Sequence, residues 1–189
     1  MHKQSDRDTA RLKRTLSWYN MMPNLIWSII HLAPISVYCY NLLDHTLLYV
    51  FIAASFIPLF LPNAFLDKIQ IGRTVQTYRR LGVNIVNQVT QNGDIINRLI
   101  RKKYPDYKAV VYQRASVHKL LQQTYAYEKF HLVMFVFFCL VTVHAIVQQH
   151  YGWAVILSLS NLLYNIYPNL LQQYIRLRLR TYKKKLESN

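Results

Sequence analysis

The stretch FHLVMFVFFCLVTVHAIV at residues 130–147 decides the fold, because it contains no lysine, arginine, aspartate or glutamate. A helix needs about 20 mostly apolar residues to cross the hydrocarbon core of a membrane, and this stretch comes close to that length. A short polar turn at residues 148–152 separates it from a second apolar stretch at residues 153–171. The pair predicts a helical hairpin that enters the membrane and returns.

A similar hairpin precedes it, with apolar stretches at residues 25–43 and 46–61. Pro34 is expected to kink the first of these, because proline removes a backbone donor from the helix interior. The second is too short for a straight span, so it is expected to be short, bent at Pro58, or partly re-entrant. We treat the hairpin as retained rather than cleaved as a signal peptide, because a second apolar stretch follows almost at once.

The basic residues are separated completely from these hairpins. All 23 lysines and arginines lie at residues 3–14, 68–129 and 176–185. Because short charged segments stay on the cytosolic side, the N-terminus, the middle segment and the C-terminus are all predicted to be cytosolic in a multi-pass protein of the cell membrane. The net charge of +15 could suggest nucleic acid as a partner. Its separation from long apolar runs excludes that class and favours anionic membrane lipids and phosphorylated substrates.

The predicted fold class is all-α, an integral membrane protein of about four transmembrane helices in two hairpins. We divide this single membrane domain into a basic N-terminus (1–15), a first hairpin (16–66), cytosolic or interfacial helices (67–129), a second hairpin (130–175) and a basic tail (176–189).

Within the middle segment, apolar residues from Ile69 to Val89 recur at roughly helical spacing and predict an amphipathic helix lying on the membrane, with an interruption at Gly82. A turn at residues 92–94 is expected to end it, before a short helix to about Lys103. Ser116 is the expected N-cap of a helix that runs into the third span.

Glu128 and His131 are three residues apart at the entrance to the third span, so they share a helix face. A carboxylate beside an imidazole raises its basicity and fixes its tautomer, as a general base acting on a hydroxyl requires. An interfacial pair at a helix end is the simpler alternative.

Antiparallel geometry brings the fourth span to the same place. If the hairpin turns near His150, facing residue numbers add to about 300, which puts Glu128 level with Gln172 and Gln173. Arg176 then lies about one turn beyond, and Asn165 about 9 Å deeper in the membrane. A base, amide donors and cations would converge in this layer.

Each of these polar residues also has a structural interpretation. Asn161 and Asn165 can equally join helices by hydrogen bonds, as amides in membranes commonly do. The basic residues from Arg176 to Lys185 can equally bind lipid head groups. His31 and His144 have no partner that the sequence identifies, and we interpret both as packing residues. The two cysteines, Cys39 and Cys139, sit in apolar runs and are interpreted as packing thiols.

The sequence contains no metal-ligand cluster, nucleotide-binding loop or nucleophile elbow, so neither a metal site nor a bound cofactor is predicted. The chain has four glycines. Hydrolase, kinase and dehydrogenase activities find no support.

The second hairpin resembles a known family. The sequence Glu128-Lys129-Phe130-His131, followed by NIYPNLLQQYIRLRL at residues 165–179, is similar to the glycosyl-diaponeurosporenoate acyltransferases of staphyloxanthin biosynthesis. In that family a Glu-x-x-His precedes an apolar span, and an Asn leads into Gln-Arg-Tyr-Asn-Arg-x-Arg-Leu. The resemblance covers about the last 70 residues. Two positions depart from the pattern, where Gln173 replaces Arg and Ile175 replaces Asn.

The resemblance implies an integral membrane enzyme that esterifies a sugar hydroxyl of a glycosylated lipid or carotenoid with a fatty acyl group. Acyl-CoA or a similar acyl donor would be a substrate. His131 would deprotonate the hydroxyl, Glu128 would orient His131, and Asn165 or Gln172 would donate to the oxyanion. Arg176 and Arg178 would bind the donor phosphates. The predicted catalytic residues are His131 and Glu128, and the predicted substrate-binding residues are Asn165, Tyr167, Gln172, Tyr174, Arg176 and Arg178.

Two other classes stay open at this point. One is a non-catalytic membrane protein that binds anionic lipid, and the other is a methyltransferase or another lipid-modifying transferase. The catalytic hypothesis expects a lipid-sized cleft with His131 and Glu128 on its wall, whereas the non-catalytic one expects His131 in a filled helix contact.

Overall fold

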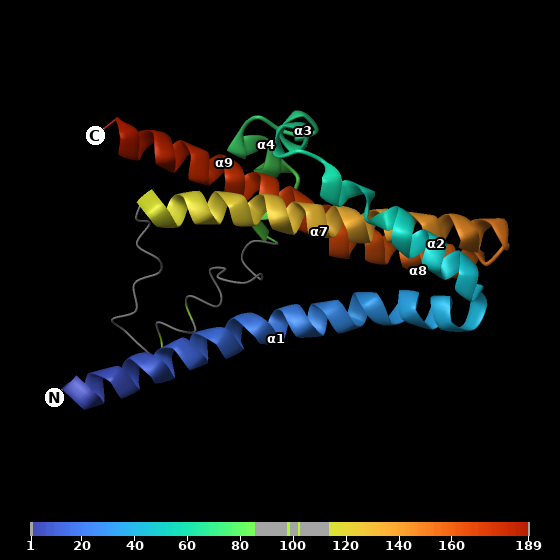
Figure 1. The fold of residues 1–189 in the computed structure, drawn as a ribbon, viewed down its shortest axis with the longest axis horizontal. Coiled ribbons are helices and arrows are strands. Elements are labelled where there is room, and N and C mark those ends of the chain that lie inside the picture. Colours follow the sequence, from blue (N-terminus) through green and yellow to red (C-terminus); the bar gives the residue numbers. More distant parts are fainter. Residues whose placement is uncertain (1, 86–97, 99–101, 103–113, 189) are drawn as a thin grey trace.

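The computed structural model describes residues 2–85, 98, 102 and 114–188. Every secondary-structure element in these residues is a helix, and the long helices lie side by side (Figure 1). The longest are α1 (His2–Leu42), α7 (Arg114–Val147) and α9 (Tyr167–Glu187), with the shorter α2 (His45–Ser55) and α8 (Tyr151–Asn161) completing the bundle. The all-α prediction is confirmed.

The chain turns back between α7 and α8 at the place predicted for the second hairpin. Helix α7 ends at Val147, and the chain turns through Gln149, whose φ of 60° is left-handed, before α8 begins. Across the hairpin, Asn161 donates to Cys139 Sγ at 3.4 Å. Gln173 lies opposite Glu128. The pairing expected from a turn near His150 is therefore confirmed.

The end of the first hairpin that contains the turn between α1 and α2 packs against α7 and α8. Helix α1 runs through Pro34 without a break, and Asp44 caps α2 by accepting hydrogen bonds from the backbone of Thr46 and Leu47. Helix α2 ends at Ser55, and a short 3₁₀ turn η1 (Ile57–Phe60) carries Pro58. The second apolar stretch is thus a short helix followed by a turn at the proline. The buried core here is formed by side chains of α1, α7 and α8, chiefly Ile35, Tyr38, Phe138, Val141 and Leu157.

Two described helices are long and apolar enough to cross a membrane, at Asn24–Leu42 and Val117–Val147. The apolar helix His45–Phe60 is shorter. The fourth predicted span does not form one regular helix, because a π-helical turn η2 (Leu162–Ile166) separates α8 from α9.

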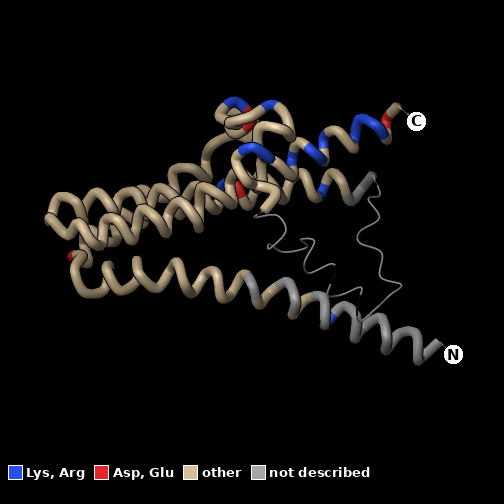
Figure 2. The backbone as a smooth tube through the Cα atoms, turned by 180° about the vertical axis from the view of Figure 1, so that it is seen from behind, with Lys and Arg blue, Asp and Glu red and all other residues tan. Residues whose placement is uncertain are grey.

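The basic residues are concentrated at one end of the bundle. Figure 2 shows the described lysines and arginines gathered at the end that holds the C-terminus, α3 and α4. The opposite end, where Asp44 and the turn between α7 and α8 lie, shows none among the described residues.

The amphipathic helix predicted from Ile69 to Val89 is wrong over the described residues 69–85. Helix α3 (Asn63–Lys68) ends just before this segment, residues 69–74 are not helical, and α4 (Val75–Arg80) is followed by a turn at Gly82 with a φ of 75°. The reason is tertiary packing, since Tyr78 and Val83 pack inward against α9. The predicted turn at residues 92–94 and the helix to Lys103 lie outside the residues whose structure is described.

Candidate functional site

Glu128 lies on α7 in a fully paired setting. Its Oε1 accepts a hydrogen bond from Gln173 Nε2 at 2.7 Å, and its Oε2 pairs with Arg176 Nη1 at 2.5 Å. Glu128 is 1% exposed and Arg176 is 0% exposed. An ion pair removed from water to this degree is stable only while both partners are present.

Asp67 is a second carboxylate that forms an ion pair with Arg176. Asp67 Oδ1 lies 3.4 Å from Arg176 Nε, and Asp67 Oδ2 lies 2.7 Å from Arg180 Nη2. The ring of Tyr125 lies under the Arg176 guanidinium at 4.3 Å, while its hydroxyl donates to Asp67 at 3.0 Å. Two carboxylates therefore neutralise two guanidinium groups between α3, α7 and α9.

Gln173 joins this pair to the middle segment. Its Oε1 accepts hydrogen bonds from the Tyr78 hydroxyl at 2.9 Å and from the backbone N–H of Ile71 at 3.3 Å. Burial raises the pKa of Tyr78 above its ordinary value, which keeps this donor protonated. We call the whole set the charged layer: Asp67, Tyr78, Tyr125, Glu128, Gln173, Arg176 and Arg180.

His131 lies about one turn further along α7 and belongs to a different environment. Both carboxylate oxygens of Glu128 are taken by Gln173 and Arg176, and neither bonds to His131. The imidazole instead lies beside the Asn165 side chain and the Tyr164 backbone. Its buried Nδ1 has no hydrogen-bond partner among the described residues, and neither has the buried Oδ1 of Asn165.

The π-helical turn explains why Tyr164 and Asn165 face α7 here. Pro168 lacks the N–H that would bond to the Tyr164 carbonyl, and its ring would clash with that carbonyl in a regular α-helix. The backbone of Tyr167 bonds instead to the carbonyl of Leu162, in the wider π pattern. Such turns frequently occur at functional sites.

Asn161 and Asn165 form a short polar chain on this helix. Asn165 Nδ2 donates to Asn161 Oδ1 at 2.9 Å, and Asn161 Nδ2 donates across to the Phe135 carbonyl at 3.3 Å. The interhelical interpretation therefore holds for Asn161. Asn165 differs because its oxygen stays unpaired within the described residues.

The other predicted residues spread over two faces of α9. Tyr174 is buried and packs against Tyr78, with ring centroids 6.5 Å apart. Arg178 is exposed and lies over the Tyr174 ring at 5.6 Å. Tyr167 and Gln172 are half-buried, and neither makes a side-chain hydrogen bond within the described residues. The structure thus brings Glu128 together with Arg176, and His131 together with Asn165, as two separate groups.

Several residues of these groups were not predicted from the sequence. Asp67 carried a usable signal, because it is one of only eight acidic residues and directly follows an apolar hairpin. Gln173 was expected level with Glu128 but was not assigned a role. Tyr78, Tyr125, Tyr164 and Arg180 carried no signal, since tyrosines and basic residues are abundant in this chain.

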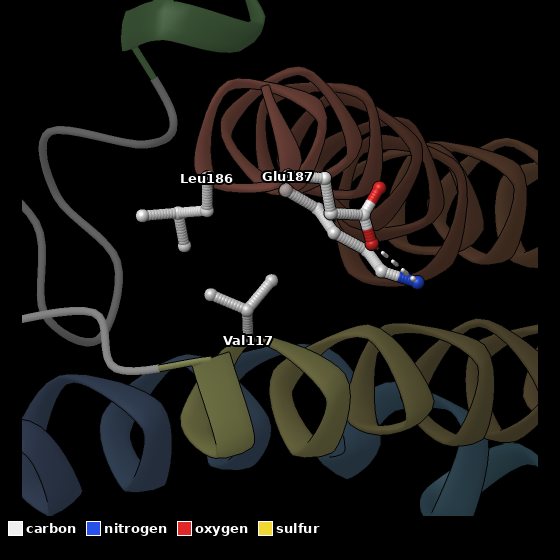
Figure 3. A pocket seen from close by; sticks show the side chains of 4 residues that line it. Val117, Leu186 and Glu187 are labelled. Carbon is white, nitrogen blue, oxygen red and sulfur yellow. Dashed lines mark ion pairs between the residues drawn. The ribbon is translucent and has the colours of Figure 1, made fainter. Parts of the chain in front are cut away.

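A small hollow lies elsewhere, between the start of α7 and the end of α9 (Figure 3). Its volume is about 150 Å³, and it is lined by Val117, Lys183, Leu186 and Glu187. Lys183 and Glu187 form an exposed ion pair at 3.7 Å. It does not include His131 or Glu128, so it is not the lipid-sized cleft that the catalytic hypothesis expects. No group of three residues able to hold a metal ion occurs in the part of the chain that the structure describes.

The fold and site define an all-helical protein with two candidate membrane-crossing helices and two polar groups between α7 and its neighbours. The chain belongs to the glycosyl-4,4'-diaponeurosporenoate acyltransferase family, whose model matches residues 62–185. No curated protein and no solved structure matches it significantly. Family membership indicates an acyltransferase of carotenoid biosynthesis and, together with the apolar helices, a membrane location. The match includes α3 and α4, and it leaves out α1 and α2.

Proposed function

We propose that the protein is a multi-pass membrane acyltransferase that esterifies a hydroxyl of a glycosylated lipid or carotenoid acceptor at the cytosolic face. The observation that carries this proposal is the pair of unsatisfied buried atoms, His131 Nδ1 and Asn165 Oδ1. Buried polar atoms are almost always hydrogen-bonded, so two neighbouring side chains whose contact leaves both atoms without a well-formed hydrogen bond are well suited to bind a substrate hydroxyl.

His131 would act as the general base. It would take the proton of the acceptor hydroxyl while the hydroxyl oxygen attacks the acyl carbonyl of the thioester donor. The tetrahedral intermediate would collapse to the ester, and the thiolate that leaves would take up the proton from His131. All the atoms of the reaction come from the two substrates.

The structure changes the roles proposed for two neighbours. Glu128 would hold α7 against α9 rather than orient His131 directly, since its oxygens are bonded to Gln173 and Arg176. Asn165 would accept a hydrogen bond from the acceptor through its unpaired oxygen, while one of its two amide N–H groups is donated to Asn161. Gln172 remains the proposed donor to the oxyanion.

The acyl donor, such as acyl-CoA, would be bound by exposed cations. Arg176 is buried and already neutralised by Glu128 and Asp67, so it is poorly placed to hold phosphates. Arg178 and the exposed lysines at 183–185 lie on the outer part of α9 at the charged end of the bundle (Figure 2). That end would face the cytosol, in line with the positive-inside rule, with both termini on that side.

The test is mass spectrometry of lipid and pigment extracts from cells that supply a glycosylated carotenoid. Cells producing the wild type are expected to accumulate a glycosylated species carrying one additional fatty acyl group. His131→Ala should lower this product by about 100-fold or more, the usual contribution of a general base. His118→Ala is the matched control, since His118 is exposed on the same helix.

Equal product from the wild type and His131→Ala would refute the role of His131. A species heavier by a methyl group would instead identify a methyltransferase.

The ion pairing within the charged layer favours a second candidate, a non-catalytic protein that binds anionic lipid through its basic tail. This candidate predicts identical extracts from producing and non-producing cells. It also predicts that purified protein enriches anionic phospholipid over zwitterionic phospholipid during extraction, and that neutralising residues 183–185 abolishes the enrichment.

A further inference from the structure

Helix α1 reaches the environment of His131 through Tyr164. The Ser28 hydroxyl lies 3.1 Å from the Tyr164 hydroxyl, which ties α1 to the π-helical turn. The ring of His31 lies 6.0 Å from the Tyr164 ring, and the ring of His131 also lies 6.0 Å from it. The Tyr164 ring is therefore a shared neighbour of two imidazoles, one from the first hairpin and one from the second.

His31 is buried without using its hydrogen-bonding capacity. It is 6% exposed, and its contacts are the Trp27 ring at 4.5 Å and the Tyr164 ring. It makes no hydrogen bond to a described residue, although an imidazole always offers at least one donor. Trp27 beside it is 43% exposed and leaves much of its indole uncovered.

Together these side chains form what we call the neutral cluster: Trp27, Ser28, His31, His131, Tyr164 and Asn165. The cluster has no lysine, arginine, aspartate or glutamate, so it offers nothing to neutralise a phosphate or a carboxylate. It offers aromatic rings together with two unpaired buried atoms, His131 Nδ1 and Asn165 Oδ1, and with the His31 imidazole, which makes no hydrogen bond to a described residue. A neutral ring that carries several hydroxyls satisfies both properties, because each hydroxyl donates and accepts while its C–H faces pack on aromatic rings.

We infer that Trp27 and His31 of α1 bind the sugar ring of the acceptor and hold one of its hydroxyls toward His131. The inference rests on the proposed function for the identity of the acceptor, but it concerns residues outside the family match. In this arrangement α1 supplies acceptor binding, whereas α7 and the π-helical turn supply the base and its neighbour.

The test measures binding without relying on catalysis. Full-length protein is reconstituted in lipid nanodiscs that contain either monoglucosyl diacylglycerol or the same amount of plain diacylglycerol, and its melting temperature is compared. Ligand that binds only the folded state raises this temperature. We expect the wild type to gain about 3 °C from the glucosyl lipid at saturating levels.

Four variants make the result specific. His31→Phe and Trp27→Leu should lose most of the gain, because they remove the hydrogen-bonding ring and the stacking surface. His31→Gln should keep much of it, since an amide also donates and accepts. His45→Phe is the matched control, an exposed histidine at the opposite end of the bundle, and should keep all of it.

The inference fails if the wild type gains nothing from the sugar, or if His31→Phe gains as much as the wild type. If His31→Phe does not fold, Trp27→Leu and His31→Gln still decide the outcome. The result is separate from that of the proposed function: a sugar-dependent gain without any acyl product would retain the binding site and reject the reaction.

Discussion

The charged layer and the neutral cluster lie next to each other along α7, yet they differ in whether a buried group has a partner of opposite charge. Both contain buried atoms without a hydrogen bond, and in the charged layer these are Nε and Nη2 of Arg176. Glu128 has both oxygens bonded, and Asp67 contacts two arginines. One turn away, His131 and Asn165 each leave a buried atom without a partner. Ionic residues inside a membrane protein are often taken as the catalytic ones. Here the direct ion pairs of Glu128 and Asp67 with arginines indicate a structural role, and the neutral groups are better suited to a substrate.

The difference has an energetic basis. A buried ion pair gains little net free energy over an apolar pair, but losing one partner leaves a charge in a medium that does not solvate it. An unsatisfied neutral atom is already removed from water in the ligand-free protein. A ligand that supplies its hydrogen bond therefore adds the free energy of that bond without a further desolvation cost for the atom. The charged layer should therefore be sensitive to mutation through stability, and the neutral cluster through activity.

The largest effect is expected from Arg176→Met. Removing the guanidinium leaves Glu128 buried and charged, and should lower the free energy of unfolding by about 3–5 kcal/mol. Thermal or denaturant unfolding of the purified protein in detergent measures this change. Arg178→Met, on the exposed face of the same helix, should change stability by less than about 0.5 kcal/mol.

Adding Glu128→Met to Arg176→Met sharpens this result. Because the stranded carboxylate is then gone, the double variant should recover part of the lost stability. A double variant less stable than Arg176→Met alone would argue against a charge-pairing role.

A smaller effect is expected from Gln173→Leu. The change leaves the Tyr78 hydroxyl, the Ile71 backbone N–H and one Glu128 oxygen without their partner, at a cost of about 1–3 kcal/mol in unfolding free energy. Gln172→Leu at the adjacent, half-buried position is the control and should be close to neutral. Equal effects of the two changes would show that Gln173 does not organise the layer.

The smallest effect on stability is expected from His131→Gln. The imidazole Nδ1 has no partner to lose among the described residues, so the unfolding free energy should change by less than about 1 kcal/mol. The same preparation is then assayed for acyl transfer, which should fall with the loss of the base. A destabilisation as large as that of Arg176→Met would break the comparison and move His131 into the structural group.

The hairpins and their register could be predicted because they depend on one property, the absence of charge over long runs. The pairing of Glu128 with Gln173 followed from counting residues around the turn. The middle segment could not be predicted in the same way. Its apolar spacing fits a helix on a membrane, but Tyr78 and Val83 are buried against α9, and periodicity does not identify which surface covers a residue.

Glu128, His131, Asn165 and Arg176 were singled out from the sequence, but the two groups into which the structure divides them were not predicted. Helical spacing places Glu128 and His131 on one face, but it does not show that Arg176 from another helix takes the carboxylate first. The contact of His31 with Tyr164 joins residues far apart in the chain, and no local pattern signals it. Sequence spacing limits which residues can meet, whereas competition among partners decides which of them do.

The π-helical turn before Pro168 also determines which face of α9 points toward α7. Its wider spacing accommodates one more residue than an α-helical turn, so the inward face of α9 is rotated by about 100° relative to a continuous helix. Leu157 on α8 and Arg176 on α9 are 19 residues apart and would point about 100° away from each other on a continuous α-helix, so the extra residue of the turn lets both face α7. Inserting or deleting one residue in this segment would rotate α9 about its axis by about 100° and would move Arg176 away from Glu128.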